Sequence, residues 1–495
     1  MRQFRNRYYK EWEKQAQGHN DPSIKTEFSE EITQNTNQPT TSATSLFAQF
    51  QKHFELTADL TTVTFKHLGM TIYYFDYLVV KEIFEQRVKD IRELKSDELE
   101  NYLYRSSYNE LTDYSKVEDS IFHGNAILFF QEKAYELPVK DGEARAVTSS
   151  DVESAIVGPH DSFVESISTN LSLIRRRIIS SKLKAIKLVI GTISKKTVYL
   201  LYIEDHVSKE EVTLLEKRIA SIKNDGILDT NMLVQLIDDN PHSPFPQFFV
   251  TERPDISVYK LFEGKIVGLI EDSPHAFCTP TGFLDFMETT DDFGQRWVVG
   301  TFIKLLRIAA LLITIFFTPL YVSVTTHHYE MIPQALLPTL VESRSRVPFP
   351  PIIEALFLEF LLELLREAGA RLPTKIGQTI GIVGGIVIGQ AAVDAGITSN
   401  ILIIVVAASA IASFVIPSYL MSASIRIVRF AFIIMAAVLG NIGIVFGFGL
   451  LVIHLTSITN LNYPYLMPLS PTRPLYWKYS LFRGAIKKNN KSETR

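Results

Sequence analysis

Apolar and charged residues are distributed very unevenly along the chain. Residues 1–296 carry charged side chains throughout, whereas 308–471 contains several long stretches with almost none. About 20 consecutive apolar residues are what an α-helix needs to cross a bilayer. The pattern therefore predicts a soluble head joined to an α-helical multispan membrane domain at 297–460. About four spanning helices are expected, near residues 302–324, 376–394, 400–421 and 430–456.

The head shows the alternation of strands and helices that is typical of an α/β fold. The aromatic and β-branched run after Gly69 suits a strand, and the apolar side chains over 83–94 recur at helical spacing. Two further strands are expected at 185–193 and 197–203. Ser208, followed three residues later by Glu211, predicts the capping box of another helix.

Two segments of the head resemble each other. Thr71-Ile-Tyr and Thr197-Val-Tyr each open a predicted strand that leads into an amphipathic helix. This suggests an internal repeat and therefore two small α/β subdomains, over 46–150 and 151–296. Residues 1–45 are expected to be a disordered polar tail, because 15–45 is rich in Gln, Asn, Thr and Ser. The first fifteen residues have no apolar core of the length that a signal peptide needs, which favours a cytoplasmic head.

Composition and charge exclude several classes of function. The 495 residues are 46% hydrophobic and 21% charged, and 50 basic against 54 acidic side chains give no reason to expect a nucleic-acid partner. The single cysteine, Cys278, excludes an internal disulfide or a multi-cysteine metal site. No phosphate loop, zinc helix or nucleophile elbow occurs, and the adjacent His327 and His328 would not chelate on a helix. We expect no enzyme activity, no cofactor and no metal.

The segment 348–373 is the most unusual part of the membrane domain. Prolines at its start and Gly369 and Pro373 at its end bound a helix over 352–369. Acidic side chains recur along it at i, i+4 and i+8, with an arginine beside them, and predict a narrow polar stripe on an apolar helix. The stripe either lies in the headgroups of an interfacial helix or lines an aqueous pore built from several copies. The predicted pore-lining residues are Glu359, Phe360, Glu363, Arg366 and Glu367.

Pairs of glycines four residues apart mark helix faces suited to close packing. In lipid, small residues drive helix association because they let backbones approach. This contact could lie within one chain or between subunits. The predicted helix-packing glycines are Gly377, Gly381, Gly385, Gly389, Gly443 and Gly447.

Three consecutive arginines, Arg175, Arg176 and Arg177, cannot all face one way on a helix. At least one is expected to contact another subunit or another part of the head; the alternative is a solvated basic helix end. The basic C-terminal tail, 461–495, is expected in the cytoplasm. With a cytoplasmic head this requires an even number of spans, so that 352–369 would be re-entrant or interfacial.

Several long motifs resemble the A subunit of the GerA-type spore germinant receptors. The resemblance covers roughly 150–470. Its markers are GPHDSFVESISTNLSLIRRR (158–177), PFPQ (244–247), ESRSRVPFPPIIEALFLEFLLELLREAGARLP (342–373), IGQTIGIVGGIVIGQAAVDAGITSN (376–400) and PYLMPLSP (464–471). The chain departs from the family pattern at Leu361, where members often carry Thr, and at Leu461-Asn462, where Phe-Gly is common.

The resemblance implies a protein of the spore inner membrane that acts with a transporter-like, germinant-binding B subunit and a lipoprotein C subunit. It also implies that A subunits assemble into a ring, expected to be a pentamer. This ring would be a nutrient-gated ion channel that triggers germination by releasing monovalent cations. The alternative is a non-conducting scaffold, a signalling subunit or a transporter component of the same complex, with 352–369 flat on the bilayer.

Overall fold

The computed structural model describes residues 45–92, 94, 99, 102–103, 108–131, 133–139, 153, 158–289, 291–371, 389–467 and 469–470. Four predicted features lie wholly or mostly outside these residues: the polar tail, the junction of the two subdomains, most of the span expected at 376–394, and the basic tail. The described chain forms two compact units. The first contains two β-sheets with their helices; the second contains residues 238–249 and the region from 281 onward.

The first sheet is antiparallel and has the strand order β1-β2-β4-β5-β3. Its elements, in chain order, are α2 (Leu46–His53), β1 (Thr61–Phe65), β2 (Met70–Tyr74), α3 (Lys81–Arg92), β3 (Asn109–Leu111), α5 (Tyr114–Phe122), β4 (Ala126–Phe130) and β5 (Lys133–Leu137).

The second sheet has the same strand order, β6-β7-β9-β10-β8. Its elements are α6 (Ile167–Arg175), β6 (Leu183–Ile190), β7 (Lys196–Ile203), α7 (Lys209–Ala220), α8 (Thr230–Ile237), β8 (Phe249–Thr251), α9 (Pro254–Phe262), β9 (Ile266–Ile270) and β10 (Ala276–Thr279). Thr71 and Thr197 therefore lie in equivalent strands, β2 and β7, of two sheets with the same topology. The head is α/β, as predicted.

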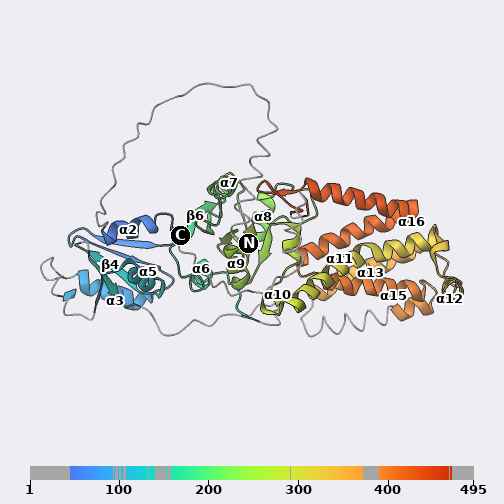
Figure 1. Ribbon diagram of the computed structural model, residues 1–495, viewed down its shortest axis with the longest axis horizontal. Helices are drawn as coiled ribbons and strands as arrows, with labels where there is room; N and C mark the ends of the chain where they lie inside the picture. Colours follow the sequence, from blue (N-terminus) through green and yellow to red (C-terminus); the bar gives the residue numbers. More distant parts are fainter. Residues whose placement is uncertain are drawn as a thin grey trace, which may run out of the picture. The chain divides into compact units, whose positions relative to one another are not determined.

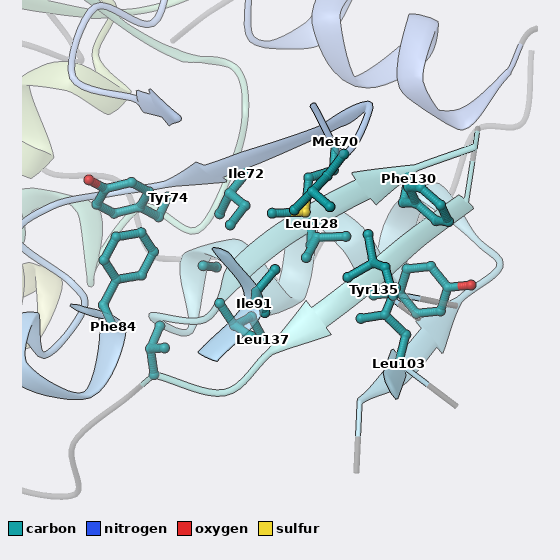
Figure 2. Close-up of a cluster of buried hydrophobic side chains, with 14 of the residues drawn as sticks. Met70, Ile72, Tyr74, Phe84, Ile91, Leu103, Leu128, Phe130, Tyr135 and Leu137 are labelled. Carbon is teal, nitrogen blue, oxygen red and sulfur yellow. The ribbon is translucent and has the colours of Figure 1, made fainter. Parts of the chain in front are cut away.

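Two apolar clusters enclose the first sheet. On one face, side chains of β2, β4 and β5 pack with Phe84 and Ile91 of α3 (Figure 2). On the other face, aromatic side chains of α2 and α5, among them Phe50 and Phe122, pack with Phe129 of β4. Every residue of β4 is buried because the strand is covered on both sides, which explains its unbroken apolar sequence.

The second unit is mainly helical. After η2 (Phe283–Met287) and α10 (Asp291–Gly294) come α11 (Trp297–Thr326), η3 (Tyr329–Met331), α12 (Leu337–Arg344), α13 (Pro351–Arg371), α15 (Asn400–Phe414), α16 (Tyr419–Ser457), β11 (Thr459–Asn460) and β12 (Tyr463–Pro464). Among the described residues, α11 and α16 are long and apolar enough to cross a membrane. Helix α11 contains the segment expected at 302–324, whereas the segment expected at 430–456 is not one helix, because the chain breaks helical geometry at Gly440 within it. The span expected at 400–421 ends earlier, at Phe414, because Pro417 interrupts it and Ser418 caps the next helix.

Helix α16 is a hairpin of two helices joined at Gly440 (Figure 1). Gly440 has φ 60° and ψ −141°, a conformation that only glycine adopts readily. Beyond it the chain turns back, so that a Cβ on Gly443 would collide with the carbonyl oxygen of Met435. A continuous helix of 39 residues would be about 58 Å long, roughly twice the hydrocarbon thickness, whereas each half of the hairpin suits one crossing.

Both free ends of the α16 hairpin reach the same loop, residues 238–249. The hydroxyl of Ser424, near the start of α16, donates to the carbonyl of Pro244. His454, near its end, lies 3.0 Å from the hydroxyl of Ser243. Tyr465 donates to the carbonyl of Pro246 at 2.8 Å. The PFPQ and PYLMPLSP motifs therefore meet at this end of the bundle, which we call the base.

Candidate functional site

Helix α13 has one exposed and one buried face. Apolar side chains at intervals of four, three and four residues are 41–56% exposed: Ile353, Phe357, Phe360 and Leu364. The opposite face packs into the bundle, where Ala355 and Leu358 join a cluster with Val322 of α11 and Leu402 of α15. Helix α13 therefore lies lengthwise in the bundle and presents an uncovered apolar stripe.

The three acids of the predicted stripe do not share one environment. Glu359 is fully buried, the Glu363 side chain is 39% exposed, and the Glu367 side chain is 57% exposed. Each step of four residues turns about 40° around a helix, so three acids cover about 80°. The stripe therefore winds from the interior of the bundle to its surface. This corrects the expectation that all three line one pore face.

Glu359 is held by groups from two other helices, and its ion-pair partner is held in turn by a third. Its carboxylate forms an ion pair with Arg429 of α16 and accepts a hydrogen bond from Thr318 of α11 at 2.9 Å. Arg429 also donates to the hydroxyl of Ser409 of α15 at 2.8 Å, and its side chain is only 2% exposed. The Glu359 carboxylate is therefore enclosed within one chain, contrary to the prediction that it lines a pore.

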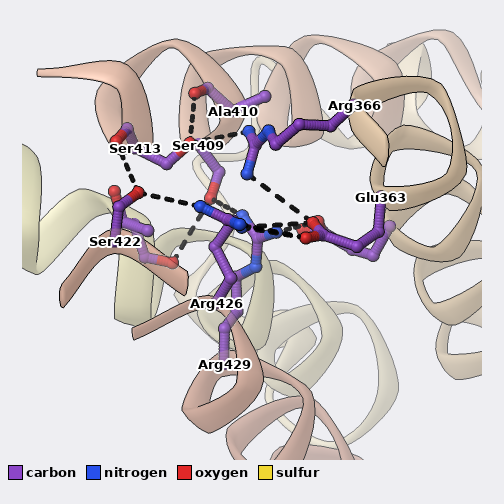
Figure 3. A network of polar contacts seen from close by, with 10 residues as sticks. Glu363, Arg366, Ser409, Ala410, Ser413, Ser422, Arg426 and Arg429 are labelled. Carbon is purple, nitrogen blue, oxygen red and sulfur yellow. Dashed lines mark hydrogen bonds and ion pairs between the residues drawn. The ribbon is translucent and has the colours of Figure 1, made fainter. Parts of the chain in front are cut away.

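Glu363 lies between two arginines (Figure 3). Arg426 of α16 donates from Nε to both carboxylate oxygens of Glu363, at 3.1 and 3.2 Å, and from Nη1 to the hydroxyl of Ser422 at 2.9 Å. Arg366 approaches the same carboxylate at 3.6 Å, donates to Ser413 at 2.9 Å, and places its guanidinium 4.7 Å from the centre of the Phe414 ring.

We call these five residues the charged seam: Glu359, Glu363, Arg366, Arg426 and Arg429. Sequence analysis did not assign Arg426 and Arg429 to the site. The available signal was that they are the charged residues in an otherwise uncharged stretch from 395 to 472. A charge within a membrane span usually faces the bundle interior and pairs with another charge, and these two arginines do.

The three consecutive arginines of the head point in different directions, as their spacing requires. Arg175 is 1% exposed and donates to both carboxylate oxygens of Asp59, at 3.0 and 2.9 Å. Its guanidinium lies 5.1 Å from the centre of the Phe75 ring. Arg177 pairs with Asp161, and Arg176 is exposed. Arg175 therefore joins α6 of the second sheet to the segment that precedes β1 of the first.

Tyr77 completes this buried group. Its hydroxyl donates to the Asp59 carboxylate that Arg175 also binds. Burial raises the pKa of Tyr77 well above its usual value, and the negative charge of Asp59 raises it further. Tyr77 therefore remains a neutral donor at any physiological pH.

Gly443 and Gly447 lie on the face by which the two halves of α16 pack. A Cβ on Gly447 would come within 3.1 Å of the Met435 sulfur and 3.2 Å of the Phe432 ring. This contact is within one chain. A Cβ built on Gly389 would make an ordinary van der Waals contact with Ile403 at 4.0 Å. Gly377, Gly381 and Gly385 lie outside the described residues.

Over the part of the chain that the structure describes, no group of three or more His, Cys, Asp or Glu side chains could hold a metal ion. His327 instead lies 2.7 Å from the carbonyl of Ala437, through Nε2, and its neighbour His328 lies against Gly440.

Comparison with known proteins identifies the family. The family model of the Bacillus/Clostridium GerA spore germination protein matches residues 48–494. The chain belongs to the GerA family. Spore germination protein GerQA of Bacillus cereus is 44% identical to it over 436 residues, covering 84% of this chain and 85% of that protein. Spore germination protein A1 of Bacillus subtilis (strain 168) is 39% identical over 408 residues, 81% of this chain and 85% of A1.

A further relative is an uncharacterized membrane protein, YfkQ, of Bacillus subtilis (strain 168), which is 38% identical over 75% of this GerA chain and 73% of its own length. Among solved structures, the N-terminal domain of the A subunit of the Bacillus megaterium spore germinant receptor GerK3 matches with a TM-score of 0.35 and 22% identity. That match covers 48% of this chain and 94% of the solved domain. The family predicted from the sequence motifs is confirmed.

Proposed function

We propose that this chain is the A subunit of a spore germinant receptor and that several copies form a nutrient-gated cation channel in the spore inner membrane. The head would lie in the cytoplasm, and the membrane domain would cross the bilayer several times. Its partners would be a transporter-like B subunit, which holds the germinant, and a lipoprotein C subunit. Assembly into a ring, expected to be a pentamer, and release of monovalent cations come from the family resemblance.

The observation that carries the proposal is the uncovered face of α13. Contact with lipid alone would explain an exposed apolar face. This face, however, continues toward Glu367, whose side chain is 57% exposed and forms an ion pair with Arg371 at 2.6 Å. A helix with an apolar stripe above an exposed acid suits a pore with a hydrophobic constriction and a carboxylate ring, which attracts cations. We place Phe360, which is 56% exposed, at the constriction.

The charged seam gives the other members of the predicted site a different role. Glu359 and Arg366 would act behind the pore, by fixing the rotation of α13, while the half-exposed Glu363 and the exposed Glu367 would face the ions. Germinant binding in the B subunit can shift the ring between two packings only by its difference in affinity for them. Because Arg176 is exposed, we propose it for the contact with another subunit.

Replacement of Phe360 by Ala tests the constriction. The smaller side chain is expected to widen it, so that spores release monovalent cations without germinant. The matched control is Phe446→Ala. Its side chain is similarly exposed, at 58%, but belongs to the second half of α16 and not to α13. Potassium release from purified spores and single-channel recording in planar bilayers are the measurements. Unchanged cation flux at normal protein levels would favour the non-conducting scaffold instead.

A further inference from the structure

The first three turns of α11 carry an apolar surface that the described part of the chain leaves exposed. The side chains that form it are 43–65% exposed: Trp297, Val298, Val299, Phe302, Leu305 and Leu306. Another side of these turns is covered, because Lys304 pairs with Glu288 of the preceding segment at 2.8 Å. We call the six exposed residues the proximal surface of α11.

The proximal surface lies at one end of the helix bundle. Both α11 and the first half of α16 run away from the base, and the ring of Phe316 in α11 packs against that of Phe432 in α16. Ser424, which contacts the base, precedes Phe432 by eight residues, or about 12 Å of helix. The same distance back along α11 from Phe316 leads to Ile308. Residues 297–307 therefore lie at the level of the base or beyond it.

The base is polar and indicates where the hydrocarbon core of the membrane ends. Its loop opens with Asp238, Asp239 and Asn240, and the side chain of His242 is exposed. Charged side chains are costly in hydrocarbon, so the base and the turns of α11 beyond it are expected outside that core. Lipid tails then do not cover the proximal surface. A cluster of exposed apolar side chains in water is typical of a surface that binds protein.

The C-terminal tail begins near this part of α11. The ring of Tyr465 packs against that of Phe283 in η2, and the amide of Phe283 donates to the carbonyl of Tyr465 at 2.7 Å. Helix η2 in turn contacts α11, where Arg307 donates to the carbonyl of Met287 at 3.1 Å. The described chain ends at Ser470, and the five residues that follow span at most about 17 Å. The tail beyond them therefore starts in the neighbourhood of α11.

Residues 475–486, with the sequence LYWKYSLFRGAI, suit an apolar binding surface. Segments that stay solvated are poor in aromatic residues, whereas this run contains Tyr476, Trp477, Tyr479 and Phe482. Apolar residues recur in it at intervals of four, three and four: Leu475, Tyr479, Phe482 and Ile486. The same intervals separate exposed residues of α11: Val298, Phe302, Leu305 and Ala309. Apolar stripes with this spacing pack against each other in paired helices.

We propose that residues 475–486 of the C-terminal tail bind the proximal surface of α11 in the same chain. The contact joins the end of the chain to the start of its first membrane helix. The basic side chains of the tail, such as Lys478 and Arg483, then remain at the membrane surface, where basic residues are favoured. The contact is independent of whether the protein conducts ions.

The test compares the full-length protein in detergent micelles with a chain that ends at Ser470. A cysteine in place of Phe302 is expected to react with a water-soluble maleimide several times faster in the shortened chain, because the tail no longer covers it. The matched control is a cysteine in place of His67, an exposed residue between β1 and β2, whose rate should not depend on the tail. If the shortened chain does not fold, the full-length double variant Tyr479→Ser and Phe482→Ser is expected to give the same increase.

A second measurement identifies the occupant. Cysteines at 302 and 482 of one chain are expected to form an internal disulfide on oxidation, seen as the loss of both thiols without a dimer. Three results would overturn the proposal. The first is an equal reaction rate at 302 with and without the tail. The second is linkage of 302 to 482 only between copies, which would make a second copy the occupant. The third is protection of 302 by reconstitution into a bilayer regardless of the tail, which would make lipid the occupant.

Discussion

At the scale of single residues, the folded chain pairs its buried charges. Arg175 and Asp59 are 116 residues apart in sequence and both are almost completely buried, with two hydrogen bonds between them. A buried ion pair contributes little net stability, but removal of one partner leaves the other charge without compensation. The contact between the two sheets therefore requires both Arg175 and Asp59.

Replacement of Asp59 by Asn is expected to destabilise the protein by about 3–5 kcal/mol, because the guanidinium of Arg175 stays buried. The control is Asp76→Asn, which breaks the exposed pair with Lys81, whose side chains are 46% and 64% exposed. That variant should change stability by less than about 1 kcal/mol. Chemical denaturation of the full-length protein, followed by head-domain fluorescence, measures both. If Asp59→Asn lowered the free energy of unfolding no more than Asp76→Asn does, Arg175 would have found another partner for its charge.

Glu153 makes stability depend on pH. Burial raises its pKa to about 7, and the nearby Glu252 adds to the effect, while a hydrogen bond from Thr251 opposes it. A carboxyl group with a raised pKa in the folded state favours folding below its unfolded pKa of 4.5, and this contribution is lost as pH rises through about 7.

Glu153→Gln is therefore expected to be more stable than the wild type at pH 8, with the advantage disappearing toward pH 4.5. The glutamine keeps the size of the side chain and removes the ionisation. Thermal unfolding of both proteins across this pH range gives the difference directly. A difference that does not vary with pH would mean that Glu153 ionises in the folded protein as it does in the unfolded one.

At the scale of elements, α16 depends on one glycine to reverse direction. Gly440 has a backbone conformation that other residues rarely adopt, and a Cβ there would lie 2.7 Å from Nε2 of His328. Asn441 follows at once and accepts a hydrogen bond from Ser323 at 2.7 Å, while His327 contacts the carbonyl of Ala437. The end of α11 thus satisfies polar groups that the reversal leaves without helical partners.

Gly440→Ala is expected to destabilise the protein by about 2 kcal/mol or more, from backbone strain together with the clash. The matched control is Gly449→Ala in the second half of the same hairpin, where a Cβ would meet nothing within 4 Å. That substitution should be neutral or slightly stabilising because alanine favours helix. Thermal unfolding in detergent distinguishes them; a tolerated Gly440→Ala would mean that the hairpin does not require this conformation.

The two faces of α13 give an accessibility pattern that can be measured. The native Cys278 is fully buried, so single cysteines can be introduced with little background. Cysteines at 353, 357, 360 and 364 are expected to react with a membrane-permeant thiol reagent much faster than cysteines at 355 and 358, which are on the buried face. Similar rates at all six positions would contradict the lengthwise packing of α13 in the bundle.

At the scale of the whole molecule, the proposed ring requires α13 of different copies to approach one another. A cysteine at position 357 or 360 is then expected to form disulfide-linked dimers on oxidation. A cysteine at 442, where the native side chain is 72% exposed on the far half of α16, serves as the control and should form few. Because one cysteine per chain can link only two copies, the measurement is the fraction of the protein that becomes a disulfide-linked dimer. Equal linking at the α13 and α16 positions, or no linking at either, would contradict a central pore lined by α13.

Much of the fold could be predicted from the sequence because its determinants are local. The apolar run of α11, the Ser208 cap of α7 and the strands near 185–203 follow from spacing and residue type over a few positions. The end of α15 at Phe414 was not predicted because apolar residues continue past it. Pro417 ends the helical pattern there, and Ser418 caps the next helix.

The sequence by itself determined the division into a charged head and an apolar bundle, the α/β character of the head, and the family. Only the tertiary structure decided which carboxylate meets which arginine, and that the last apolar run is a hairpin. Glu363 and Arg426 are 63 residues apart, and their contact depends on how α13 and α16 are rotated against each other. Periodicity within one helix gives the angles between its side chains, but the neighbouring helices determine which of those side chains are buried.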